Sequence, residues 1–325
     1  MAASDAHAAY RGVTVAVLGA SGFIGRWVAR ALAEHGATLA LVARDAASLS
    51  ERRAGLGAST SVIEADLARE GTACEIVEAT RPAVVFNLAG YGVDPGERDE
   101  HAARTINTEL PRRIVQALAA RRDDAWCGQR LVHVGSALEY GDAGGDLAEG
   151  SPPRPTTLYG RSKLAGTLAV SRGCAELGVR GVTARLFTVY GAGEHAGRLL
   201  PTLLDAVRHD DPIPLTAGLQ QRDFTYVEDV AEGLLRLGSA TAARPGEVVN
   251  LATGRLTEVR RFAAECALAL GLDPARLVFG ALPTRAEEMR HEPVSVARLR
   301  ELVGWVPPTT VPDGIRRTIA RAAEP

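Results

Sequence analysis

The residues best suited to chemistry are a tyrosine and a lysine four positions apart, Tyr159 and Lys163. On a helix this spacing puts both side chains on one face. A free tyrosine has a pKa of about 10, and a neighbouring ammonium favours the phenolate. The pair could therefore exchange a proton with an alcohol or a ketone near neutral pH. Because the spacing also arises by chance on many helices, its meaning depends on the elements around it.

A serine, Ser136, follows a buried segment over 130–134 that is typical of a parallel strand. Doubly wound sheets bind their ligands at the carboxyl ends of such strands. The Ser136 hydroxyl could polarise the carbonyl oxygen that Tyr159 protonates. Without Tyr159 this serine would be read as an ordinary turn residue. We predict that the catalytic residues are Ser136, Tyr159 and Lys163.

A glycine-rich turn lies between an apolar strand over 13–18 and a helical segment over 23–34. Its first glycine permits the tight turn, its second lets the backbone approach a pyrophosphate, and its third lets the helix pack close to the sheet. The anion would lie at the helix N-terminus, where unpaired N–H groups and the helix dipole attract it. A plain tight turn is the alternative, but a strand before it and a helix after it favour a dinucleotide site. The cofactor-binding residues predicted in this turn are Gly19, Ser21, Gly22, Phe23, Ile24 and Gly25.

The next two strand ends bear on the choice of cofactor. A carboxylate after the strand over 38–43 would bind the adenosine ribose and repel a 2′-phosphate. Ala43 occupies that place, and Arg44, which follows it, could pair with a 2′-phosphate through charge-assisted hydrogen bonds. We predict NADP(H); NAD(H) stays possible, because a one-residue slip would put Asp45 in that place. Asp66, after the third strand, could accept from the adenine amino group or act as an ordinary capping acid.

Strands and helices alternate through the first part of the chain and predict an α/β, Rossmann-like doubly wound parallel sheet. The later helices are expected over 105–120 and 158–176. The later strands are expected over 61–65, 83–88, 130–134, 182–187 and 248–251.

Beyond residue 191, prolines break the chain into short elements. We therefore predict a dinucleotide-binding domain over 11–191, to which residues 223–254 return. A smaller C-terminal substrate-binding lobe is expected from 192–222 and 255–325. The loop over 140–155, rich in glycine, acids and proline, could form a mobile cover beside the site.

The composition excludes several classes of protein. With 46% hydrophobic residues and a net charge of -2, the chain describes a soluble globular protein with a sizeable core. Arginines dispersed among acids argue against a nucleic-acid surface. Four singly placed cysteines predict a reducing cytoplasm and no metal site. Neither a signal peptide nor a membrane span is expected, and the assembly is expected to be a homodimer.

The chain resembles the extended short-chain dehydrogenase/reductase family, the epimerases, dehydratases and reductases of nucleotide sugars. The resemblance covers almost the whole chain. Besides the glycine turn and Tyr159/Lys163, it is carried by Asp66-Leu67, Asn87-Leu88-Ala89-Gly90, Gly135-Ser136-Ala137-Leu138-Glu139-Tyr140-Gly141, Arg185-Leu186-Phe187-Thr188-Val189-Tyr190-Gly191, Arg222-Asp223-Phe224-Thr225-Tyr226-Val227-Glu228-Asp229-Val230 and Gly304-Trp305-Val306-Pro307.

The resemblance implies roles for further residues. Leu67, Leu88, Ala89 and Gly90 would join Tyr159 and Lys163 at the cofactor. A nucleoside diphosphate sugar would lie in the second lobe, with Arg222 and Arg285 on its diphosphate or nucleotide ribose, Glu288 near the ribose, and Arg198 as a further phosphate ligand. Guanidinium groups grip phosphates with paired hydrogen bonds, although each arginine alone could be a surface ion pair.

Departures from the family pattern narrow the activity. Dehydratases of the family place an Asp-Glu pair directly after the catalytic Ser/Thr, where this chain has Ala137 and Leu138. Neither side chain can move a proton, which argues against 4,6-dehydration, and Leu138 also argues against decarboxylation. Thr188 stands where the family often has an asparagine that contacts substrate. His133, inside a strand, reads as a packed core histidine.

The ending Glu139-Tyr140-Gly141 resembles that of 4-keto-hexose reductases. The sequence therefore favours an NADPH-dependent reductase of a nucleotide-linked 4-keto-6-deoxyhexose. The alternatives are a nucleotide-sugar epimerase, a reductase of a non-sugar ketone, and a cofactor-sensing binding protein without turnover.

Overall fold

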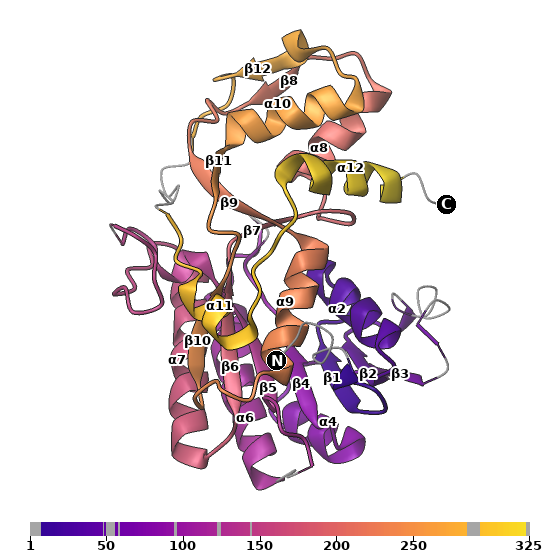
Figure 1. Ribbon diagram of the computed structural model, residues 1–325, viewed down its shortest axis with the longest axis vertical. Coiled ribbons are helices and arrows are strands. Elements are labelled where there is room, and N and C mark those ends of the chain that lie inside the picture. The colour runs from indigo at the N-terminus through magenta and orange to yellow at the C-terminus, as the bar shows by residue number, and fades with distance from the viewer. Residues whose placement is uncertain are drawn as a thin grey trace.

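The computed structural model describes residues 8–47, 49, 56–57, 59–93, 96–121, 125–143, 145–284 and 293–322. Its main sheet has seven strands in the order β10-β6-β5-β4-β1-β2-β3, all paired in parallel. The strands are β1 (Thr14–Leu18), β2 (Thr38–Ala43), β3 (Thr60–Glu64), β4 (Val84–Asn87), β5 (Leu131–Ser136), β6 (Gly181–Leu186) and β10 (Glu247–Leu251). The predicted Rossmann-like doubly wound sheet is confirmed and fills the lower half of Figure 1.

Helices cover both faces of this sheet. One face carries α2 (Phe23–Glu34) and α9 (Val227–Ser239), which pack against each other. The other carries α4 (Thr72–Thr80), α6 (Leu110–Ala120) and α7 (Leu158–Leu177). Since strand side chains alternate between faces, two separate buried clusters result, and α2 and α9 contribute to one while α4, α6 and α7 contribute to the other.

The helix expected over 105–120 begins earlier than predicted and is not uniform. It starts as α5 (Glu100–Arg104), passes through the π-helical η1 (Thr105–Glu109) and continues as α6. The Asp99 side chain caps its start by accepting from the backbone N–H groups of His101 and Ala102. Pro111 lies in the first turn of α6, where proline is tolerated.

The upper part of Figure 1 contains the smaller elements of the second half of the chain. They include α8 (Leu199–Asp205), η3 (Ala206–Arg208), α10 (Val259–Leu270), η4 (Pro274–Arg276), α12 (Val311–Ala322) and the pair β8 (Ile213–Leu215) with β12 (Leu277–Phe279). A three-stranded sheet of β11 (Leu256–Glu258), β9 (Gln221–Tyr226) and β7 (Thr188–Tyr190) lies between this part and the main sheet. The predicted boundary between residues 222 and 223 falls inside β9, and the division into lobes stays a prediction.

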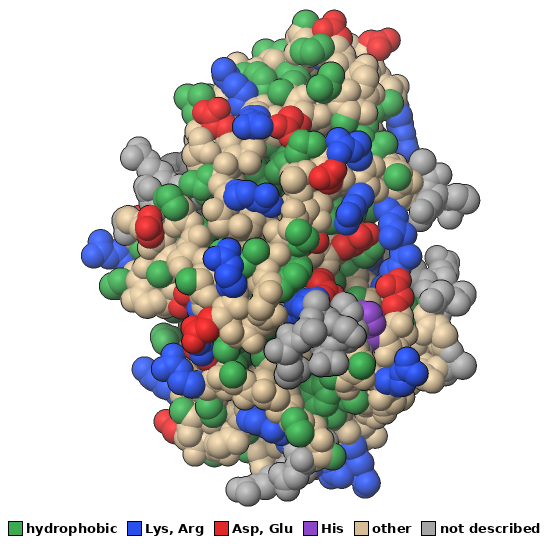
Figure 2. Space-filling model, in the orientation of Figure 1, with side chains coloured by type: hydrophobic (Ala, Val, Ile, Leu, Met, Phe, Trp, Pro, Cys, Tyr) green, Lys and Arg blue, Asp and Glu red, His purple; other side chains and the backbone are tan. Residues whose placement is uncertain are grey.

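The remaining short helices are η2 (Ala137–Glu139) and α11 (Ala297–Val303), which packs near β10. In the part of the chain that the structure describes, no helix has both the length and the apolar character needed to cross a membrane. Lysine, arginine and acidic side chains are interspersed on the face shown in Figure 2.

Candidate active site

The packing of α7 against β5 brings the three predicted catalytic residues together. Ser136 ends β5 and is the N-cap of η2. Thr157 caps α7, accepting from the N–H of Gly160 at 2.9 Å. A Cβ added to Gly160 would lie 2.3 Å from the Leu138 carbonyl oxygen, so α7 and η2 touch through their backbones. The Ser136 side chain lies close enough to Tyr159 to act on its phenol.

Burial governs the charges of this group. It raises the pKa of Tyr159 to about 12, helped by the charge of Glu139 and opposed by the Ser136 hydrogen bond and the charge of Arg198. Burial lowers the pKa of Lys163 to about 8, and the charge of Glu139 opposes that shift. The pKa of Tyr159 is thus shifted away from the phenolate by burial, and Lys163 is not among the groups that shift it. At neutral pH, Tyr159 is a protonated phenol beside a charged Lys163, which suits a proton donor.

Asn107 supports the helix of the candidate site, and the sequence argument missed it. It is buried in the π-helical η1, and its Nδ2 donates to the Tyr91 carbonyl oxygen at 2.7 Å and to Ser162 Oγ at 2.9 Å. Its Oδ1 accepts from the N–H of Tyr91 at 3.0 Å. Asn107 thus ties the loop after β4 to the helix that carries Tyr159. The available signal was an asparagine inside an otherwise helical segment, where its side chain disfavours the helix.

The glycine turn forms a cradle that only glycine fits. Gly19 has a φ of 78°, and a Cβ on it would lie 2.8 Å from the backbone nitrogen of Ala89. A Cβ on Gly25 would lie 2.2 Å from the Gly19 carbonyl oxygen. Gly22, the N-cap of α2, offers no side chain to the first-turn N–H groups, and that turn contains no acid. These residues fit the diphosphate of a dinucleotide, with Leu88-Ala89-Gly90 beside the turn.

The predicted adenosine-side residues lie at the carboxyl ends of neighbouring strands. Arg44 follows β2 and is exposed, while Asp45 accepts from the N–H of Ala47 at 2.9 Å. Asp66 follows β3, is exposed, and accepts from the N–H of Ala68 at 2.9 Å. Leu67 next to it is buried. Arg44 and Asp45 are therefore both exposed at this strand end, and one oxygen of the Asp45 carboxylate accepts a hydrogen bond within its own turn.

On the substrate side, the structure brings one predicted arginine near the catalytic tyrosine. Arg198 is the N-cap of α8, and its charge acts on Tyr159. Its Nε donates to Oε1 of Glu194 at 3.3 Å; burial raises the pKa of that carboxyl to about 7. Arg222 lies on β9 and donates to the Gln221 carbonyl oxygen at 2.8 Å. The remaining two predicted residues, Arg285 and Glu288, lie outside the described residues.

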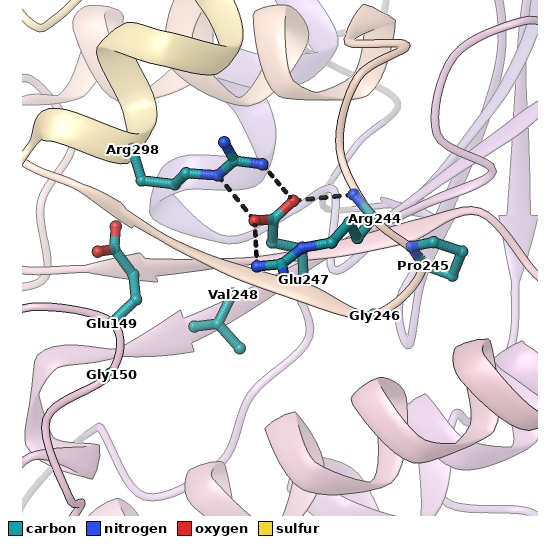
Figure 3. Close-up of a pocket in the computed structure, with 8 residues that line it drawn as sticks. All are labelled: Glu149, Gly150, Arg244, Pro245, Gly246, Glu247, Val248 and Arg298. Atoms are coloured by element: carbon teal, nitrogen blue, oxygen red, sulfur yellow. Dashed lines mark hydrogen bonds and ion pairs between the residues drawn. The ribbon is translucent and has the colours of Figure 1, made fainter.

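A pocket of about 530 Å³ lies elsewhere, at the amino end of β10 (Figure 3). Inside it, Glu247 accepts from Arg298 at 2.7 and 2.9 Å and from the N–H of Arg244 at 2.8 Å. None of the predicted site residues that the structure describes lines it, and ligands of doubly wound sheets bind at the opposite strand ends. The pocket is therefore separate from the active site.

The loop over 140–155 borders this pocket through Glu149, and it is attached to neighbouring segments rather than free to cover the active site. Leu147 forms a β-bridge with Val294, and Gly141 forms one with Arg154. Glu149 accepts from the N–H of Asn250 at 2.9 Å. The expected mobile cover is thus attached to the side of the main sheet.

Residues 15–252 match the NAD dependent epimerase/dehydratase family, and the chain belongs to that family. It is 32% identical, over 93% of both chains, to a dTDP-6-deoxy-L-talose 4-dehydrogenase (NAD(P)(+)) of Kitasatospora kifunensis. It is 33% identical to a dTDP-4-dehydrorhamnose reductase of Burkholderia thailandensis, over 71% of this chain and 67% of the relative. Among solved structures, MoeE5 in complex with UDP-glucuronic acid and NAD is similar at 26% identity and a TM-score of 0.80, covering 96% of this chain and 100% of MoeE5.

The resemblance to the extended short-chain dehydrogenases/reductases is thereby confirmed. The protein is an NAD(P)-dependent enzyme of this type. The roles of its individual site residues stay predictions.

Proposed function

We propose that the protein is an NADPH-dependent reductase of a nucleoside-diphosphate-linked 4-keto-6-deoxyhexose. The observation that carries the proposal is the contact of η2 with α7, which brings Ser136 to Tyr159, whose pKa of about 12 keeps the phenol protonated at neutral pH. Ala137 and Leu138, the two residues after the serine, have no group that could move a second proton. The relatives named for dTDP-sugar 4-dehydrogenase and reductase activities support the sugar and make dTDP the first nucleotide to test.

The residues divide the work of reduction in a simple way. Ser136 Oγ accepts from the N–H of Leu138 at 3.2 Å, which leaves its proton to polarise the ketone oxygen. Tyr159 donates its proton to that oxygen, so the carbonyl becomes a hydroxyl. The Lys163 ammonium stabilises the phenolate left behind. NADPH, when bound, supplies the hydride that the carbonyl carbon accepts.

The cofactor would be held by the glycine turn, by Leu88-Ala89-Gly90 and by Asp66 and Leu67. The preference for NADPH rests on Arg44, an exposed guanidinium at the strand end where a 2′-phosphate would lie. Arg198 and Arg222, with Arg285 and Glu288, would bind the nucleotide diphosphate. We propose further that the enzyme works as a cytoplasmic homodimer without nucleic acid, and light scattering of the purified protein tests the assembly.

The second candidate function is epimerisation of a nucleotide sugar. It is favoured by MoeE5, a similar protein whose structure holds UDP-glucuronic acid and NAD together. An epimerase returns the same hydride to the sugar, whereas a reductase releases NADP after each turnover.

The test is incubation of the purified protein with NADPH and a dTDP-4-keto-6-deoxyhexose. We expect one equivalent of NADPH to be consumed per sugar reduced. Interconversion of sugar epimers with unchanged NADPH absorbance would replace the reductase with an epimerase. Activity restricted to flavonoid or steroid ketones would instead move the assignment to a non-sugar substrate.

A further inference from the structure

A fully buried carboxylate lies three residues after the catalytic serine. Oε1 of Glu139 accepts from the N–H of Ser136 at 2.8 Å and from Thr167 Oγ1 at 3.0 Å. Its Oε2 accepts from Nε of Arg185 at 2.8 Å. The carboxylate therefore joins the end of β5, the helix α7 and the strand β6. A buried charge is costly unless it is paired and hydrogen-bonded, and here both oxygens are occupied.

The surrounding backbone fixes this carboxylate in place. A Cβ on Gly135 would lie 2.6 Å from Oε1 of Glu139. The glycine therefore leaves the space on β5 that the Glu139 side chain fills. Arg185 is also held, because its guanidinium lies over the ring of the buried Tyr140 at 4.6 Å. Glu139 is thus a rigid link between the serine and the helix that carries the tyrosine and lysine.

Thr167, which donates to Glu139, lies four residues after Lys163 on α7, so the two side chains are on the same face of the helix. The charge of Glu139 accordingly opposes the lowering of the pKa of Lys163 by burial. His133 faces the same lysine from β5, and burial together with the lysine charge holds its pKa well below the ordinary value, so it is neutral. Two further sets of charges lie around Glu139 and Lys163. Arg185 forms an ion pair with Glu139, and the charges of Glu97 and Arg198 raise and lower the pKa of Tyr159, respectively.

We propose that Glu139 is a positioning residue, which holds Ser136 against α7 and places a negative charge on the helix face that carries Lys163. This inference rests on the catalytic roles proposed for Ser136 and Lys163. It gives a role to Glu139, the carboxylate directly before Tyr140-Gly141, which takes no part in the proton transfer itself.

The test is the pH dependence of Glu139→Gln, which keeps the size and the acceptor oxygen but removes the charge. Without the carboxylate the pKa of Lys163 falls, so the ammonium is lost at a lower pH. We expect the alkaline limb of both kcat/KM and NADPH affinity to move down by about one pH unit or more. NADPH affinity is measured by fluorescence and needs no sugar, so it tests Glu139 even if the proposed substrate is wrong.

Two further variants separate charge from structure. The double variant Glu139→Gln/Arg185→Met leaves no arginine unpaired, and its alkaline limb should be shifted as in Glu139→Gln. It also provides the test if the single variant does not fold. Glu247→Gln removes another buried, arginine-paired carboxylate far from the site, and its pH profile should match that of the wild type. A wild-type alkaline limb in folded Glu139→Gln, or its restoration in the double variant, would overturn the proposal.

Discussion

Both faces of the main sheet carry an apolar cluster, but across β4, β5 and β6 they differ at one row of side chains. Toward α2 and α9, the central strands present buried apolar residues such as Phe86, Val132 and Val182. Toward α7, the same strands present Asn87, His133 and Thr183, which are paired in register on β4, β5 and β6 and are all buried. Both faces are packed by helices, so burial alone does not explain the difference.

The buried polar side chains on the α7 face lower the stability of the fold. Asn87 Nδ2 lies 3.1 Å from His133 Nδ1, yet Asn87 Oδ1, His133 Nε2 and Thr183 Oγ1 are buried with no hydrogen-bond partner within the described residues. Such groups destabilise a fold relative to apolar ones. His133 on this face interacts with the charge of Lys163, which indicates that these polar groups serve the site, within a face that otherwise packs an apolar cluster.

The largest effect is expected on the α7 face. Tyr159→Phe keeps the ring packed and removes the acid, so kcat should fall by about 10² to 10⁴-fold. NADPH affinity and the melting temperature should stay close to those of the wild type. Steady-state kinetics with the keto sugar, alongside thermal unfolding, give both quantities. Near-normal turnover would show that Tyr159 is not the acid.

A matched change on the α2/α9 face should act on stability alone. Leu234 on α9 is fully buried in the apolar cluster. Leu234→Ala should lower the free energy of unfolding by about 2–5 kcal/mol, because it leaves a cavity. Denaturant unfolding measures this loss, and kcat/KM should be unchanged well below the melting temperature. A folded Leu234→Ala enzyme as impaired as Tyr159→Phe would erase the distinction between the faces.

Arg44→Ala tests the cofactor edge of the sheet. Only NADPH carries the 2′-phosphate, and a charge-assisted hydrogen bond contributes about 1.5–3 kcal/mol. NADPH should therefore bind about 10- to 100-fold more weakly. NADH binding should change little, as fluorescence titration of both cofactors would show. Equal losses for both, or a wild type that prefers NADH, would shift the role to Asp45.

The smallest effect concerns Glu194, which lies on neither face and holds Arg198. Since its pKa is raised to about 7, the carboxylate forms as pH rises through 7 and competes for the arginine. Binding of dTDP-glucose should weaken a few-fold between pH 6 and pH 8. This corresponds to the interaction energy of about 1 kcal/mol or less that is typical of a partly exposed ion pair such as Glu194–Arg198. Calorimetry should show a flat profile in Glu194→Gln. If Glu194→Gln showed the same pH dependence of dTDP-glucose binding as the wild type, another titrating group would be responsible.

The sequence predicted the main sheet well because its strands are long apolar runs closed by recognisable glycine, serine and aspartate ends. Ser136, Tyr159 and Lys163 could be proposed together because Ser136 ends a strand and the other two lie one turn apart near the start of α7. The three-residue strands β7, β8, β11 and β12 were missed because so few residues carry no detectable period. The Glu139–Arg185 pair joins residues far apart in sequence, so only the fold shows it.

The most direct test of the reductase assignment follows the hydride itself. The protein is incubated with a dTDP-4-keto-6-deoxyhexose and NADPH deuterated at the transferred position, and the sugar is analysed by mass spectrometry and NMR. We predict one deuterium at C4 of the product for each NADPH oxidised, and none with Tyr159→Phe. A product epimerised without deuterium, while NADPH stays unoxidised, would contradict the account.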